Sequence, residues 1–158
     1  MEILGVEIQK EEDENIILGN FRDGYIQDDL STVDFIEKQI NKLNIDRVYT
    51  HYYNDGHQDH RNCSYAVSAA ARRKVNEILL FQGPSTKVDF EPHYYIGISE
   101  KDFEKKIESL KCYKTQIEKG TLDIEVIKAT ARLHGFGHNT TYAEAFEINH
   151  ISRGENEV

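Results

Sequence analysis

The sequence predicts an α/β fold with a largely parallel sheet flanked by helices. Short β-prone runs alternate along the chain with longer stretches whose apolar residues recur at helical spacing. Residues that typically begin and end helices stand at the boundaries between these stretches. Because the carboxyl ends of parallel strands meet the amino ends of the following helices, we expect binding sites at those junctions.

The N-terminal part of the chain predicts a strand and then a helix. After a short apolar start at residues 3–6, the run IILG at residues 16–19 suits a buried strand. Ser31 and Asp34 have the spacing of a capping box, and apolar residues follow at helical intervals. We therefore expect an amphipathic helix over residues 32–43.

The middle of the chain repeats the alternation. DRVYT at residues 46–50 is a β-prone run, and the alanine-rich segment over residues 62–75 predicts the helix after it. ILLF at residues 78–81 predicts a buried strand that ends in the turn QGPST, and residues 94–98 predict another strand.

Two helices are predicted after the last of these strands. Ser99 and Asp102 form a second capping box, and one apolar stripe then continues to a stop at Gly120. A final helix should begin near residue 121 and end at Gly135.

Length and charge exclude several classes of protein. The 158 residues, 39% of them hydrophobic, suffice for one domain with a core, so residues 1–158 are predicted to form a single domain. The net charge of -9 disfavours nucleic acid and anionic membranes as partners. No signal peptide or run of about 18 apolar residues is visible, which favours a cytoplasmic protein.

The segment HYYNDGHQDHR, residues 51–61, is the strongest candidate for a functional site. If a helix begins here, the spacing of His57 and His60 places both imidazoles on one face, where they could share a zinc site. Asp59 lies between them and could accept a proton from an imidazole N–H. The alternative is a solvated loop that happens to be rich in histidine, but the position between a strand and a helix favours a site.

At these residues the sequence resembles the PIG-L or LmbE-like family of zinc-dependent N-deacetylases. The similarity is carried by THYYNDGHQDHRN together with LGNFRDG, LLFQGPST, FEPHYY, LKCYKTQ and YAEAF, in the order of the family. It implies a Rossmann-like layered fold and hydrolysis of an N-acetylglucosamine-type amide with zinc, or another divalent metal, as cofactor.

The resemblance also implies roles for individual residues. His60 would be a metal ligand, and His57 would be the imidazolium that assists the tetrahedral intermediate. Asp59 would be the carboxylate that orients His57. Arg22, in FRDG, resembles a family arginine near the substrate, although pairing with Asp23 explains it equally well.

One family motif, Ala-His-Pro-Asp-Asp, does not occur in the 158 residues. In the family it supplies the other metal ligands and the general base, so we expect the first βαβ unit to be missing and metal occupancy to be low. Asp55 or His51 would have to serve as substitute ligands. An uncovered sheet edge would favour a homo-oligomer or a partner chain. The alternative function is a non-catalytic homologue or fragment that acts as a binding or assembly subunit.

Overall fold

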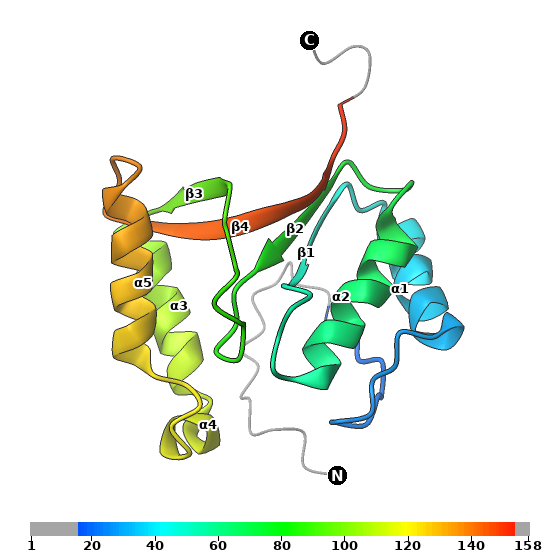
Figure 1. The fold of residues 1–158 in the computed structure, drawn as a ribbon, viewed down its shortest axis with the longest axis horizontal. Helices are drawn as coiled ribbons and strands as arrows, with labels where there is room; N and C mark the ends of the chain where they lie inside the picture. The colour runs from blue at the N-terminus through cyan, green and yellow to red at the C-terminus, as the bar shows by residue number, and fades with distance from the viewer. Residues whose placement is uncertain (1–15, 154–158) are drawn as a thin grey trace. The chain divides into compact units, whose positions relative to one another are not determined.

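The computed structural model of the chain describes residues 16–153, so the apolar start at residues 3–6 lies outside the described part. The elements, in chain order, are α1 (Leu30–Leu43), β1 (Arg47–His51), α2 (Gln58–Ala71), β2 (Glu77–Phe81), β3 (Tyr94–Ile98), α3 (Glu100–Lys111), α4 (Lys114–Glu118), α5 (Ile124–Phe136) and β4 (Tyr142–Ile151) (Figure 1). Every helix in this range is too short or too polar to traverse a bilayer.

The four strands form one sheet in the order β1-β2-β4-β3. β1 pairs with β2 in parallel, from Arg47 opposite Glu77 to His51 opposite Phe81. β4 pairs with β2 in the antiparallel direction, with Phe81 opposite Phe146. The predicted α/β class is confirmed, but the prediction of a largely parallel sheet is wrong, because β4 makes the sheet mostly antiparallel.

β4 was not predicted from the sequence, although its residues carry a strand signal. Ala143 and Ala145 are buried, and Glu144 between them is only half-buried, which is the alternation of a strand with one face toward a core. The alternation is weak because alanine is a poor marker of β structure. β4 is far from β2 in the sequence, and its antiparallel pairing with β2 makes the sheet mixed rather than parallel.

The helix starts agree with the predictions to within a few residues. α1 begins at Leu30 because Asp29, rather than Ser31, is its N-cap residue, and the Asp29 carboxylate accepts a hydrogen bond from the Thr32 N–H at 3.0 Å. Ser99 caps α3 as predicted, and accepts from the Asp102 N–H at 3.1 Å.

Two other predictions are wrong. The helix expected to continue to Gly120 is divided, since α3 ends at Lys111 and α4 begins only at Lys114. The run IILG forms no strand, and Ile16, Ile17 and Leu18 are 46%, 39% and 57% exposed. An apolar run without a neighbouring strand to pair with does not become part of a sheet.

The chain divides into two compact units. Among the described residues, one unit contains residues 19–94 and 145–153, and the other contains residues 16–18 and 95–144. β4 passes from the second unit into the first, so the expectation of a single domain over residues 1–158 stays a prediction.

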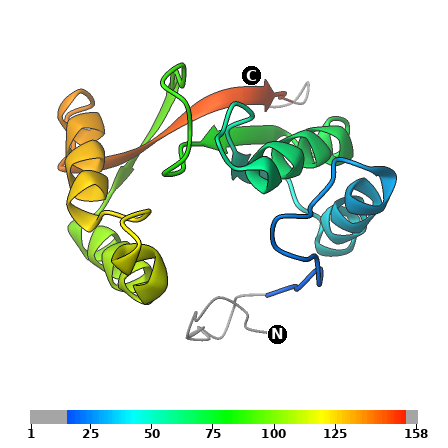
Figure 2. The same cartoon turned by 60° about the horizontal axis from the view of Figure 1, so that its bottom comes forward.

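The unit with residues 19–94 is built on β1 and β2. α2 packs on both strands and α1 packs on α2, as Figures 1 and 2 show. Its core includes Ile40 from α1, Val67 and Ala71 from α2, and Ile78 and Leu80 from β2. Ala66, Ala70 and Ala71 of α2 are buried, and their small side chains let the helix approach the sheet closely.

The other unit has its own small core between α3 and α5. Phe103, Ile107 and Ala131 are buried together, and the rings of Phe103 and Tyr142 are stacked with their centroids 3.9 Å apart. α3 and α5 lie side by side in both views (Figures 1 and 2). The residues predicted as a site all belong to the first unit.

Replacing Ile78 with alanine should lower the free energy of unfolding by about 2 to 5 kcal/mol, the usual cost of removing a large aliphatic side chain from a core. Ile78 is 0% exposed. Urea denaturation measures the change, and Val88→Ala is the control because Val88 is fully exposed. Equal losses in the two variants would contradict the assignment of this core.

Candidate functional site

His51, His57 and His60 come together where β1 passes into α2. His51 is the last residue of β1 and His57 is the N-cap residue of α2. The Nδ1 atom of His57 accepts a hydrogen bond from the Asp59 N–H at 3.2 Å, so the helix begins earlier than the sequence predicted. The ring centroids of His57 and His60 are 4.7 Å apart, which makes the two residues neighbours, as expected.

His51 and His60 form a face-to-face stack. Their ring centroids are 3.8 Å apart with an interplanar angle of 3°, and Phe81 packs against His51 at 4.7 Å. An imidazole nitrogen binds a metal with a lone pair that lies in the plane of its ring. Because the two rings lie in parallel planes, His51 and His60 cannot both bind one ion in this arrangement. His51 is therefore a stacking partner of His60 and not its fellow ligand.

Asp55 is the buried carboxylate that holds this cluster together. It is 1% exposed, and one of its oxygens accepts from the His57 N–H at 2.7 Å and lies 3.2 Å from His60 Nδ1. Ser85 donates to the same oxygen, and Thr86 donates to the other at 2.9 Å. A carboxylate on Nδ1 leaves Nε2 of His60 free for a metal or another partner.

The hydrogen bonds to Asp55 keep it ionised in spite of its burial. Burial alone would raise the pKa of Asp55, but the donors Ser85, His57 N–H and Thr86, together with the charge of His60, hold this pKa below its usual value. Burial has the opposite consequence for His51, and lowers its pKa to about 4, with a further contribution from His60. His51 is thus a neutral ring at physiological pH.

The Asp59 side chain makes its hydrogen bonds to the loop of residues 22–26. Its carboxylate accepts hydrogen bonds from the Gly24 N–H at 2.6 Å and from the Ile26 N–H at 3.2 Å. The contact with His57 is made by the Asp59 backbone N–H. These contacts do not provide the hydrogen bond from the His57 ring to the Asp59 carboxylate that the family resemblance implied.

Arg22 lies in the loop that Asp59 contacts. The guanidinium carbon of Arg22 is 4.1 Å from the centroid of the Tyr25 ring, which is a cation–π arrangement. Of the two expectations for Arg22, a substrate contact or a pair with Asp23, neither is decided by this contact. Tyr25 is 59% exposed, so the stacked arginine is accessible to a ligand.

Two further histidines pack on one tyrosine ring. His138 stacks on Tyr95 with centroids 3.7 Å apart, and His134 meets the same ring edge-on at 5.8 Å. All three belong to the other unit. Tyr52, which follows β1, is 2% exposed and donates a hydrogen bond to the Asp89 carbonyl, so it is part of the core.

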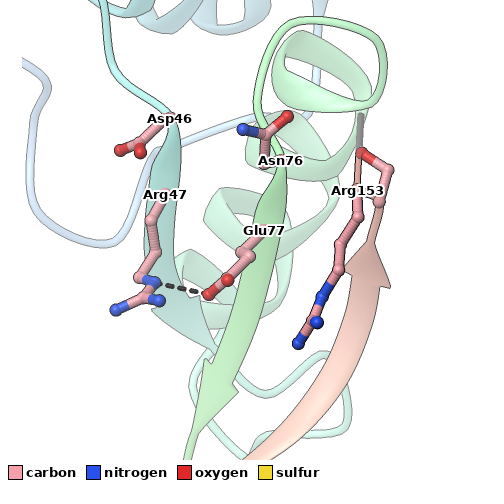
Figure 3. A pocket seen from close by; sticks show the side chains of 6 residues that line it. Asp46, Arg47, Asn76, Glu77 and Arg153 are labelled. Atoms are coloured by element: carbon pink, nitrogen blue, oxygen red, sulfur yellow. Dashed lines mark hydrogen bonds and ion pairs between the residues drawn. The ribbon is translucent and has the colours of Figure 1, made fainter. Parts of the chain in front are cut away.

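A polar hollow lies at the opposite end of β1 and β2 from the histidines. It is lined by Asp46, Arg47, Asn76, Glu77, Ser152 and Arg153 (Figure 3). Arg47 and Glu77 begin the two parallel strands, whereas His51 and Phe81 end them. The Arg47 guanidinium pairs with the Glu77 carboxylate, so these two charges neutralise each other. This hollow is separate from the histidine site.

The residues of the site do not make a complete metal centre. Among residues 16–153, no three side chains of His, Cys, Asp or Glu come together in an arrangement that could hold a metal ion. A catalytic zinc usually takes three protein ligands. Of the two nitrogens of His60, Nδ1 lies against the Asp55 carboxylate at 3.2 Å, so Nε2 is the one that remains for a ligand role.

Comparisons with known proteins point to one class, the PIG-L deacetylases. Residues 1–71 match the PIG-L family, described as GlcNAc-PI de-N-acetylase. Over 83 residues the chain is 37% identical to the uncharacterized deacetylase YaiS of Escherichia coli, an alignment that covers 52% of this chain and 44% of that protein. The chain thus spans less than half the length of this relative.

Solved structures share the fold. The conserved protein TT1542 from Thermus thermophilus has a TM-score of 0.70 at 22% identity, over 87% of this chain and 67% of that one. N,N'-diacetylchitobiose deacetylase from Pyrococcus horikoshii has a TM-score of 0.64 at 17% identity, over 88% of this chain and 60% of that one. The resemblance to the PIG-L and LmbE-like family is confirmed, and so is the fold class.

Sequence reasoning proposed His57, Asp59, His60 and Arg22 as site residues and gave less weight to the residues that contact them. Asp55 and His51 were considered only as substitute ligands, and Ser85 and Thr86 only as parts of a turn. The signal for Asp55 was its place two residues before His57, where a carboxylate can accept the N–H that opens the following helix.

Replacing His51 with phenylalanine should make the stability of the metal-free chain less sensitive to acid. The pKa of His51 is about 4 in the folded chain and 6.5 ordinarily, so between these values the unfolded chain binds more protons. Protonation therefore lowers the free energy of unfolding as pH falls from about 6.5 to 4. Phe keeps the stacked ring without the proton site.

Urea denaturation at several pH values in the presence of a chelator measures this effect. The gap in free energy of unfolding between parent and variant should change across the window and stay constant above it. A constant gap from pH 4 to pH 8 would show that His51 is not a neutral buried ring.

Asp55→Asn should lower the free energy of unfolding by about 1 to 3 kcal/mol, because the new amide turns an N–H toward donors that the carboxylate now satisfies. Asp89→Asn is the matched control, since Asp89 accepts one hydrogen bond from Asn54 in an exposed position. That variant should change stability by less than about 0.5 kcal/mol. Thermal or urea unfolding measures both, and equal effects would contradict a structural role for Asp55.

Proposed function

We propose that this chain, by itself or as part of a larger enzyme, catalyses the metal-dependent hydrolysis of an N-acetyl group on an amino sugar. The observation that carries the proposal is the His57–His60 pair on the first turn of α2, with His60 Nδ1 held by the buried Asp55 carboxylate. The match of residues 1–71 to PIG-L and the similarity to an Escherichia coli deacetylase support the same reaction class.

The reaction adds water to the acetamide carbonyl and releases acetate and an amine. In the proposal, His57 acts in its protonated form, in which Nδ1 carries a proton and no longer accepts a hydrogen bond from the Asp59 N–H. The protonated ring donates a hydrogen bond to the oxyanion of the tetrahedral intermediate and then gives its proton to the departing nitrogen. The backbone N–H groups at the N-terminus of α2 favour the negative charge of the oxyanion and disfavour a positive charge on His57, so they stabilise the intermediate and help His57 to release its proton.

Zinc, or another divalent metal, would supply Lewis-acid polarisation of the carbonyl and activation of water. His60 would be one protein ligand, through Nε2. The described residues do not complete a ligand set, as His51 is stacked parallel to His60 and Asp55 is engaged by Ser85, Thr86 and the His57 N–H. Metal binding by this chain is therefore proposed to depend on ligands other than those in residues 16–153.

The substrate class is part of the proposal. Arg22, exposed on the Tyr25 ring, would contact a hydroxyl or anionic group of an N-acetylated amino sugar. One solved structure of the same fold is a diacetylchitobiose deacetylase, which supports a sugar amide. The cytoplasmic location, the absence of nucleic acid partners and the formation of a homo-oligomer stay predictions. The last of these concerns the sheet edge, and β1 is the strand at one end of the described sheet.

The second candidate is a non-catalytic homologue or fragment that acts as a binding or assembly subunit. The count of ligands favours it, because the described part of the chain offers one oriented histidine where a catalytic zinc usually needs three protein ligands. The two candidates differ in whether zinc binds in stoichiometric amount and whether acetate is released.

His60→Ala should abolish zinc binding, whereas His57→Ala should leave zinc bound and slow acetate release by about 10² to 10⁴-fold, the range typical of acid–base groups. Calorimetry with zinc and an acetate assay on N,N'-diacetylchitobiose measure the two effects. His138→Ala, exposed and in the other unit, is the control. A parent chain that neither binds zinc nor releases acetate would favour the binding subunit, and retained zinc in His60→Ala would overturn the role of His60.

A further inference from the structure

The loop of residues 22–26 is fastened to the first turns of α2 by side chains of that helix. The two oxygens of Asp59 accept separate hydrogen bonds, one from the Gly24 N–H at 2.6 Å and one from the Ile26 N–H at 3.2 Å. Asn62 Nδ2 donates to the Ile26 carbonyl at 2.7 Å, and Gln58 donates to the Gly24 carbonyl. Side chains of α2 thus bind the backbone N–H and the carbonyl of both Gly24 and Ile26.

The conformation of the loop matches this attachment. Gly24 has a φ of +78°, which is in the left-handed region that favours glycine. The Tyr25 N–H donates to the Arg22 carbonyl at 3.0 Å, which closes a turn between the two residues. The side chain of Arg22 then lies over the ring of Tyr25. The hydrogen bonds at Gly24 and Ile26 therefore hold the residues on either side of Tyr25, whose ring contacts the Arg22 guanidinium.

The burial of Asp59 gives these hydrogen bonds weight. Asp59 is 7% exposed, and a buried carboxylate depends on its donors because water does not replace them. Asp59 stands between His57 and His60 in the turn that carries both histidines. The hydrogen bonds from Gly24 and Ile26 to Asp59 therefore attach the loop of residues 22–26 to the turn that carries the two histidines.

We propose that the Asp59 carboxylate is a positioning residue that fixes the Arg22 loop against the histidine-bearing turn of α2. Its task is to hold Gly24 and Ile26, and through Tyr25 the guanidinium of Arg22, in one arrangement with respect to His57 and His60. The ligand contact of Arg22 rests on the proposed function, whereas the attachment of the loop does not. The proposal assigns Asp59 to the loop rather than to the orientation of the His57 ring.

The attachment itself can be tested by hydrogen exchange at single amides, followed by nuclear magnetic resonance. In Asp59→Asn, one oxygen becomes an NH2 group that cannot accept and the remaining oxygen loses its charge, so both hydrogen bonds are weakened or lost. Exchange at Gly24 and Ile26 should become faster, by about tenfold or more at the amide that faces the NH2 group. Amides of β2 should keep their parent rates.

Asp123→Asn is the matched control. Asp123 also accepts two backbone N–H groups, those of Glu125 and Val126, but it caps α5 in the other unit. It should leave exchange at Gly24 and Ile26 unchanged. Asn62→Ala removes a third attachment of the same loop and should accelerate exchange at Ile26 while the Asp59 contacts remain. Parent exchange rates at Gly24 and Ile26 in a folded Asp59→Asn chain would overturn the proposal.

Kinetics distinguishes a role through Arg22 from a role through His57. If Asp59 acts through the loop, Asp59→Asn raises KM about as much as Arg22→Ala does, with little change in kcat, and the double variant is no worse than Arg22→Ala alone. A fall in kcat with KM unchanged, independent of Arg22, would overturn this role of Asp59.

The two proposals fail in different ways. If the parent chain with zinc releases no acetate, the deacetylase proposal fails, and the exchange experiment still decides whether Asp59 holds the loop. If acetate is released but exchange in Asp59→Asn is unchanged, the deacetylase proposal stands and the loop attachment is wrong.

Discussion

The site depends on one buried carboxylate, Asp55. It accepts hydrogen bonds from Ser85 and Thr86, which follow β2, and from the His57 N–H at the start of α2, and it touches His60. The segments it joins are far apart in the sequence. A buried charge is tolerated only when its oxygens are satisfied, so these segments can close on Asp55 in few ways. The ring of His60 takes its direction from this requirement.

The histidine stack follows from the same constraint. With Nδ1 of His60 against Asp55, the face of the His60 ring is covered by His51, which Phe81 supports from the neighbouring strand. Burial keeps His51 neutral, so the stack places no positive charge on the face of the His60 ring. The cluster therefore contains three imidazoles with different tasks: one packs, one is held by a carboxylate, and one caps a helix.

Two aspartates of the same short segment serve different neighbours. Asp55 binds the turn after β2, and Asp59 binds the loop that carries Arg22. The first turn of α2 thus lies between two attached loops, one on each side of the histidine pair. This arrangement offers a rigid frame for a ligand, since sites held by secondary structure and satisfied hydrogen bonds lose little geometry on binding.

Local sequence determined the elements whose physical causes are local. Helical periodicity and capping predicted α1, the start of α3 and the end of α5 closely, and the spacing of His57 and His60 predicted that the two rings would be neighbours, because residues three apart share a helix face. The tertiary structure alone decided the direction of β4, the partners of Asp55 and the direction of the Asp59 carboxylate. The pairing of β4 with β2, the hydrogen bonds from Ser85 and Thr86 to Asp55 and those from Gly24 and Ile26 to Asp59 all join groups separated by thirty or more residues. Such pairings depend on which buried polar groups can satisfy one another after the chain has folded, and a local pattern contains no information about that.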